Sequence, residues 1–236
     1  MTSTPYADLA TRLQTVLDLE YPPVAVARVD APPSGIAAWT DAVPSACTFW
    51  RRAEEQVFFA DEAAHMGCPI GAMVMGFELP PAKQEELMGL VGDMCSLAYI
   101  REEEIPHIPH FDPGPRGAVY GPLATFPLEP DNVILWLTPK QTMFLEESLG
   151  GTLWTGPQDG VFGRPACGVL PTAAGREAAS ISLGCIGMRT FTEIPDAYVL
   201  AAVPGSALET LADGLDATLA VNETMEAQYQ EMKAAV

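Results

Sequence analysis

The sequence predicts an α/β or α+β fold in a single domain over residues 1–236, and three observations lead to it. Apolar residues make up 48% of the chain and charged residues 18%, which is typical of a globular protein with a large buried core. Short apolar runs bounded by Gly, Pro, Asn or Asp alternate with segments of helical periodicity. The composition is not that of a disordered chain. Strands and helices are therefore expected to interleave.

The individual elements follow from these local patterns. Apolar residues at helical spacing predict helices over residues 6–21, 80–98, 140–149 and 206–219, with the last continuing into 222–236. Short apolar runs predict strands over residues 22–29, 117–123, 132–139 and 196–205. The polar, proline-rich segment 101–116 is expected to be a loop that separates two halves, residues 20–100 and 117–205.

The charge balance limits the classes of partner. The chain has 31 Asp and Glu against 12 Lys and Arg, a net charge of −19 that repels nucleic acid and anionic membrane surfaces. No apolar run approaches the roughly 20 residues of a membrane-spanning helix, and the N-terminus lacks the features of a secretory signal. We therefore expect a cytoplasmic protein with reduced cysteines, and the odd count of five cysteines also argues against a disulfide framework.

Two cysteine motifs recur in the same order. Cys47 and Cys167 each follow an alanine shortly after a proline, in PSAC and RPAC. Further along, Cys68 and Cys185 each follow a glycine and have another glycine close behind, in GCPIG and GCIG. An expected strand precedes each pair, so the pattern indicates an internal duplication. We expect two pseudo-repeated strand–Cys–helix halves packed around a central site where the four cysteines meet.

Four converging thiolates favour an iron–sulfur centre. Thiolates are soft ligands that suit iron–sulfur clusters or tetrahedral zinc. Structural zinc usually takes closely spaced cysteine pairs, and no CxxC is present. Widely spaced cysteines beside Gly67 and Gly184 suit a [4Fe–4S] cluster better, because glycine lets backbone N–H groups approach the sulfurs. The alternative is that the cysteines are ordinary buried thiols.

Several other residues are candidates for supporting roles. His65, close to Cys68, is the nearest expected proton donor, and Met66 is an alternative ligand. Arg51 and Arg189 lie close in sequence to cysteines and are expected to contact an anionic cluster or substrate, although surface ion pairs are the simpler use of such residues. Cys95 is expected to be a small buried hydrophobe on a helix. His107 and His110 are expected to lie in a solvated loop.

The order of these motifs resembles the DUF169 family of bacteria and archaea. The likeness covers roughly residues 20–205, and its most specific parts are GCPIGA and SLGCIGMR. The resemblance implies that cysteines at positions 47, 68, 167 and 185 recur in the family. Many members carry a Cys-x-x-Cys at the last site, where this chain has Met188, whose thioether is either a weak ligand or a packing group. The family is a domain of unknown function, so it implies a pattern and no mechanism.

These observations predict an iron–sulfur protein with a [4Fe–4S] cluster on Cys47, Cys68, Cys167 and Cys185. A redox or lyase-type enzyme acting on a small molecule is favoured over a simple electron carrier, because the chain is long for a ferredoxin. The alternatives are a haem protein with Cys, His65 or Met as axial ligand, and a cofactor-free protein that binds a small metabolite. The expected partners are a small-molecule substrate or a redox protein, and a homodimer is one possible assembly.

Overall fold

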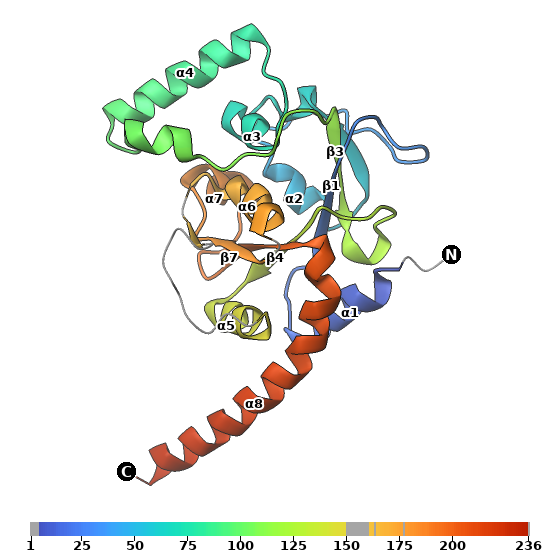
Figure 1. Ribbon diagram of the computed structural model, residues 1–236, viewed down its shortest axis with the longest axis vertical. Helices are drawn as coiled ribbons and strands as arrows, with labels where there is room; N and C mark the ends of the chain where they lie inside the picture. Colours follow the sequence, from blue (N-terminus) through green and yellow to red (C-terminus); the bar gives the residue numbers. More distant parts are fainter. Residues whose placement is uncertain (1–4, 150–160, 163, 177, 236) are drawn as a thin grey trace.

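The computed structural model describes residues 5–149, 161–162, 164–176 and 178–235, and it confirms an α+β fold (Figure 1). The strands are β1 (Val24–Val29), β2 (Phe58–Asp61), β3 (Gly117–Pro122), β4 (Asn132–Leu137), β5 (Val161–Phe162), β6 (Ser180–Ser182) and β7 (Val199–Pro204). The α-helices are α1 (Ala7–Val16), α2 (Thr48–Arg52), α3 (Pro69–Val74), α4 (Pro81–Ser96), α5 (Pro139–Ser148), α6 (Val169–Arg176), α7 (Ile186–Thr192) and α8 (Leu208–Ala234). Short 3₁₀ turns are η1 (Ala63–His65), η2 (Glu102–His107), η3 (Leu123–Thr125), η5 (Ala166–Gly168) and η6 (Gly205–Ala207).

The strands form one sheet with the order β2-β3-β1-β4-β7-β6-β5. Neighbouring strands are antiparallel except at one edge, where β5 pairs in parallel with β6. Read outward from the central β1–β4 pair, and leaving aside the two-residue edge strand β5, each half of the sheet places its first strand, then its third, then its second. A two-fold axis between β1 and β4 would produce this order. The duplication inferred from the cysteine motifs remains a prediction, and by strand order its midpoint falls between β3 and β4, after the segment 101–116.

Both faces of the sheet are buried, because alternate residues of each strand point to opposite sides. In β4, Ile134 and Trp136 belong to one core, whereas Val133, Leu135 and Leu137 belong to the other. The first core lies against the helices that carry or adjoin the four cysteines, and the second packs against α1, α5 and α8 (Figure 1). The strands therefore read as continuous apolar runs, as the sequence predicts.

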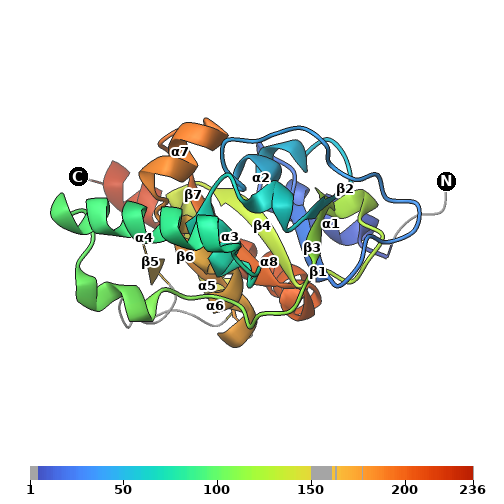
Figure 2. The same cartoon turned by 90° about the horizontal axis from the view of Figure 1, so that it is seen from above.

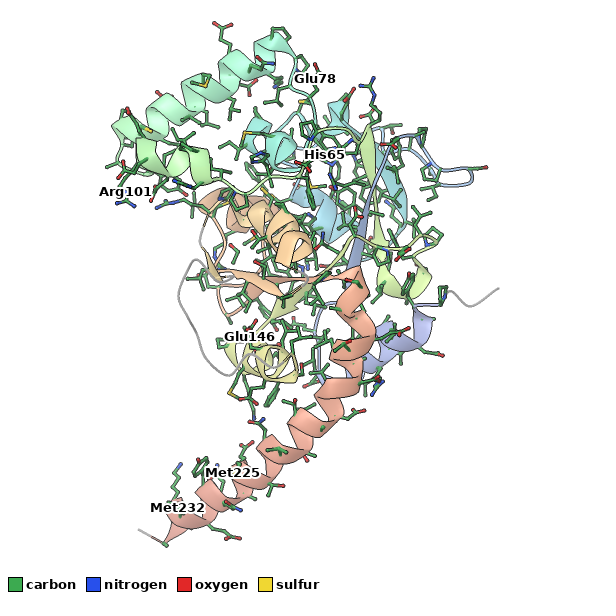
Figure 3. The ribbon with its side chains drawn as sticks, in the orientation of Figure 1. His65, Glu78, Arg101, Glu146, Met225 and Met232 are labelled. Carbon is green, nitrogen blue, oxygen red and sulfur yellow. The ribbon has the colours of Figure 1, made fainter. Side chains whose placement is uncertain are left out.

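The last helix confirms the expected continuation toward the C-terminus. Leu208, Leu211 and Leu215 in its first turns are buried against the sheet. Further along, α8 contacts α5 through Asn222 with Glu147 and Glu226 with Lys140, and its last turns, where Met232 lies, project away from the body (Figure 3). No helix among the described residues is long and apolar enough to cross a membrane.

One segment stands apart from the body of the domain. Residues 80–109, here called the cap, comprise α4, η2 and their connections, and α4 runs beside α3 (Figure 2). The helix predicted over residues 80–98 is α4, which ends at Ser96; Val91 alone in it is buried, and Ala98 lies beyond the helix end with a φ of 52°. Part of the apolar side of α4 faces a cavity and not a packed core. The expected loop over 101–116 contains the turn η2.

Candidate functional site

All four predicted cysteines line one cavity of about 1330 Å³. They enter it from four separate segments: Cys47 precedes α2, Cys68 precedes α3, Cys167 lies in η5, and Cys185 precedes α7. Each half of the sheet supplies two of them: Cys47 follows β1 and Cys68 follows β2 in the first half, and Cys167 follows β5 and Cys185 follows β6 in the second. The structure thus brings together residues that are far apart in the sequence, whereas Cys95 on α4 is half-buried and does not line the cavity.

Three of the cysteines occupy the N-cap position of a helix, and two of these, Cys68 and Cys185, cap it with their side chains. Cys68 Sγ accepts a hydrogen bond from the backbone N–H of Gly71 at 3.4 Å, and Cys185 Sγ accepts one from Met188 at the same distance. Ser, Thr and Asp normally make this contact, and here sulfur replaces their oxygen. Pro69 at the first helical position supports the start of α3. The sulfurs are therefore held by backbone amides, which favour a negative charge on sulfur.

The neighbouring glycines serve the fold in a way that the sequence analysis did not foresee. A Cβ atom at Gly67 would lie 2.5 Å from the carbonyl oxygen of Val43, so this position requires close backbone packing. Gly184 has a φ of +89°, which disfavours other residues, and a Cβ there would also collide with the Met188 side chain. The amides that reach the sulfurs belong to Gly71 and Met188, whereas the Gly184 N–H donates to Ser182 Oγ at 3.0 Å.

Burial disfavours ionisation of two of the thiols, Cys47 and Cys167. Burial raises the pKa of Cys47 to about 11, and the charges of Cys68 and Cys185 raise it further. Burial also raises the pKa of Cys167 well above its ordinary value, with added contributions from the other three cysteines. These mutual effects show that the four sulfurs are electrostatic neighbours. An occupant that stabilises thiolates must bring positive charge into the cavity.

This arrangement predicts an order of thiol reactivity in the metal-free protein. At pH 8 a thiol with a pKa of about 11 is ionised to roughly one part in a thousand, and the thiolate is the reactive species. We expect iodoacetamide to modify the half-buried Cys95 before Cys47 and Cys167, as measured by mass spectrometry of peptides over time. Labelling of Cys47 at the same rate as Cys95 would contradict this description of the cavity.

His65 is buried behind the cavity wall in an aromatic cluster. Its Nδ1 lies 2.6 Å from the carbonyl oxygen of Asp61, which can only accept, so Nδ1 carries the proton. Its Nε2 lies 2.9 Å from Tyr120 Oη and therefore accepts the tyrosine hydroxyl. Burial lowers the pKa of His65 to about 4, so the imidazole is neutral at physiological pH. His65 does not line the cavity itself, but Tyr120 does.

The two arginines predicted to contact the cofactor lie outside the cavity wall. Arg51 pairs with Glu54 at 2.5 Å and lies over the ring of Tyr21. Arg189 donates to the carbonyl oxygens of Leu183 at 2.6 Å and Tyr198 at 3.1 Å. Both therefore tie loops together near the cysteines. The catalytic roles predicted for His65, Arg51 and Arg189 remain predictions.

The remaining candidates are divided by their positions. Met188 is buried and lines the cavity, and its sulfur accepts a hydrogen bond from Thr192 Oγ1 at 3.4 Å. His107 is exposed at the cavity rim, whereas Met66 packs in the core away from it. Within the part of the chain that the structure describes, no three His, Cys, Asp or Glu side chains are grouped closely enough to hold a single metal ion.

Sequence reasoning missed two contributors to the cavity. Tyr120 lies on an expected strand. Its role depends on the hydrogen bond to His65, and no local sequence pattern connects two residues so far apart in the chain. The apolar side of the cap forms the other wall, which includes Leu90, Val91 and Met94. The signal for the cap was the helical periodicity of residues 80–98, which does not distinguish a packed face from one that lines a cavity.

Together, the fold and site define a class of protein: an α+β domain with four cysteines, two from each half of one sheet, around a capped cavity. The chain belongs to the DUF169 family, described as uncharacterised ArCR, whose model matches residues 12–214. This confirms the resemblance seen in the sequence. No curated protein and no solved structure matches the chain.

Proposed function

We propose that this protein holds a [4Fe–4S] cluster on Cys47, Cys68, Cys167 and Cys185 and acts with it as a redox or lyase-type enzyme on a small molecule. The observation that carries the proposal is that the four cysteines line one cavity from four separate segments. When bound, such a cluster supplies electrons, or an iron that polarises a substrate. The protein residues supply the ligands, the amide hydrogen bonds and the shape of the cavity.

The donor chemistry of the cavity supports a cluster over a single ion. The four soft thiols suit iron–sulfur chemistry, whereas the carboxylates and the imidazole that also line the cavity belong to the cap: Glu86, Glu103, Glu104 and His107. Their sulfurs are not gathered at the spacing that one metal ion requires, and a cube-shaped cluster takes each sulfur on a different iron atom. The positive irons would also offset the burial that raises the pKa of Cys47 and Cys167.

The hydrogen bonds of His65 weaken the haem alternative. Its unprotonated nitrogen, Nε2, already accepts the Tyr120 hydroxyl, so axial ligation would break that hydrogen bond in a buried site. Within the proposed site, Tyr120 holds its proton toward His65 Nε2. Its oxygen is therefore available at the cavity wall as a hydrogen-bond acceptor.

The size of the cavity supports an enzyme over a simple electron carrier. Ligand sites in proteins commonly measure about 300–1,000 Å³, and this cavity of about 1330 Å³ exceeds that range. A second molecule therefore fits beside the cluster. The acidic composition and the free cysteines support a cytoplasmic location, and the partner is a small molecule or a redox protein.

The absorption spectrum of the anaerobically purified protein tests the proposal. A broad visible band that dithionite bleaches is expected from a cluster. A sharp, intense Soret band would identify haem instead. A colourless protein without metal would reject both cofactors and favour the cofactor-free binding protein.

A further inference from the structure

The cap breaks the symmetry of the cysteine site. In the strand order of the sheet, α3 with Cys68 corresponds to α7 with Cys185. After α7 the chain reaches β7 through a short connection, whereas after α3 it passes through the whole cap before β3. The cap therefore adds a wall to one half of the site that the other half lacks. It runs along the cysteine side of the molecule beside α3 (Figure 2).

The cap wall that faces the cysteines is apolar. Leu90, Val91 and Met94 of α4 line the cavity, and Ile105 and Ile108 line it at the far end of the cap. Val91 is buried, but Leu90 keeps 36% of its surface exposed. Packing within the protein therefore leaves part of the apolar surface of this wall uncovered. A ligand that covered these side chains would gain their hydrophobic burial.

The charged residues of the cap that line the cavity have ion-pair partners within the cap. Glu86 pairs with Lys83 at 2.6 Å, and Arg101 pairs with Glu104 at 3.0 Å. Arg101 lies at the outer end of the cap, away from the body (Figure 3). Arg164, beside the Cys167 loop, has its guanidinium 4.0 Å from the centre of the Tyr99 ring. The described part of the cap therefore presents no unpaired cation that could bind an anionic ligand.

We propose that the space between the cap and the cysteines binds an uncharged, mostly apolar small organic molecule. Tyr120, with its oxygen free to accept, offers one polar contact to a hydroxyl or amine of that molecule. The inference deepens the proposed function by naming the class of substrate. It rests on that function only in taking the cluster to occupy the opposite, cysteine-bearing wall. The apolar subsite itself requires no metal.

The test uses the neutral fluorescent probe N-phenyl-1-naphthylamine with the full chain, both as purified without oxygen and after removal of iron. Val91→Trp fills the subsite and is expected to weaken probe binding about tenfold or more. Met88→Trp is the matched control, because Met88 is on the same helix, is 69% exposed and does not line the cavity. It should leave the affinity within about twofold of the wild type.

A second variant guards against misfolding of the first. Met94→Glu places a charge on the same wall at a half-buried position and should also weaken binding of the probe. Equal affinities for the wild type and both cavity variants would overturn the inference, as would tighter binding of the anionic probe 1-anilinonaphthalene-8-sulfonate than of the neutral one. The iron content of the protein as purified without oxygen separates the two proposals: protein that binds the probe but was purified without iron would reject the cluster alone, and protein that holds iron but does not bind the probe would reject the subsite alone.

Discussion

Replacement of Cys68 or Cys185 by serine is expected to reduce the iron bound per chain to less than about a tenth of the wild-type value. Serine keeps a side-chain acceptor at the start of α3 or α7, where each sulfur now accepts a backbone N–H. The helices should therefore form, and the loss of iron would report on the missing thiolate. Iron would be measured on anaerobically purified protein whose circular dichroism matches the wild type.

Cys95→Ser is the matched control for this experiment. Cys95 is a free, half-buried cysteine on α4 that does not line the cavity, so its replacement should leave the iron content unchanged. The same iron content in Cys68→Ser, Cys185→Ser and Cys95→Ser would show that the cavity cysteines do not hold the metal. The outcome therefore separates ligands from cysteines that merely pack.

The second large effect is a pH dependence of stability that originates at His65. The pKa of His65 is about 4 in the folded protein because the ring is buried, against about 6.5 in the unfolded chain. The unfolded state therefore binds a proton over this range that the folded state does not. The free energy of unfolding should fall by about 3 kcal/mol as the pH decreases from 6.5 to 4, and this contribution is complete above pH 6.5.

The contribution of His65 is measured as a difference between variants. Denaturant unfolding of the metal-free protein at several pH values should give a weaker pH dependence for His65→Gln than for the wild type. His107→Gln is the control, because His107 is exposed at the cavity rim. The same pH dependence in wild type and His65→Gln would contradict a buried neutral imidazole, whatever the absolute stability of the variant.

The strands β1, β3, β4 and β7 could be predicted from the sequence because they are long enough and buried on both faces, whereas the shorter strands β2, β5 and β6 were not predicted. Runs such as VAVARV and NVILWL are apolar at every or nearly every position, and they form β1 and β4. The short helices α2, α3 and α7 were not predicted, since five to seven residues are too few for a helical period to be recognised. Their positions depend on the cysteine caps and on packing against the sheet.

The meeting of the four cysteines could be anticipated from the repeated motifs, but the environment of each could not. Arg51 and Arg189 are close to cysteines in sequence, yet each comes four residues after a cysteine that precedes a helix. The cysteine lies at the N-cap, and the arginine lies one turn further along the helix axis. The two side chains therefore have different surroundings, and the arginine contacts other partners. The number of residues between a cysteine and an arginine does not show which neighbours the arginine side chain reaches.

The central claim is tested most directly by counting iron and acid-labile sulfide in the anaerobically purified full chain. A [4Fe–4S] cluster on the four cavity cysteines predicts four iron atoms and four sulfide ions per chain. Protein that is fully folded and binds neither iron nor sulfide, even after anaerobic reconstitution with both, would contradict the claim.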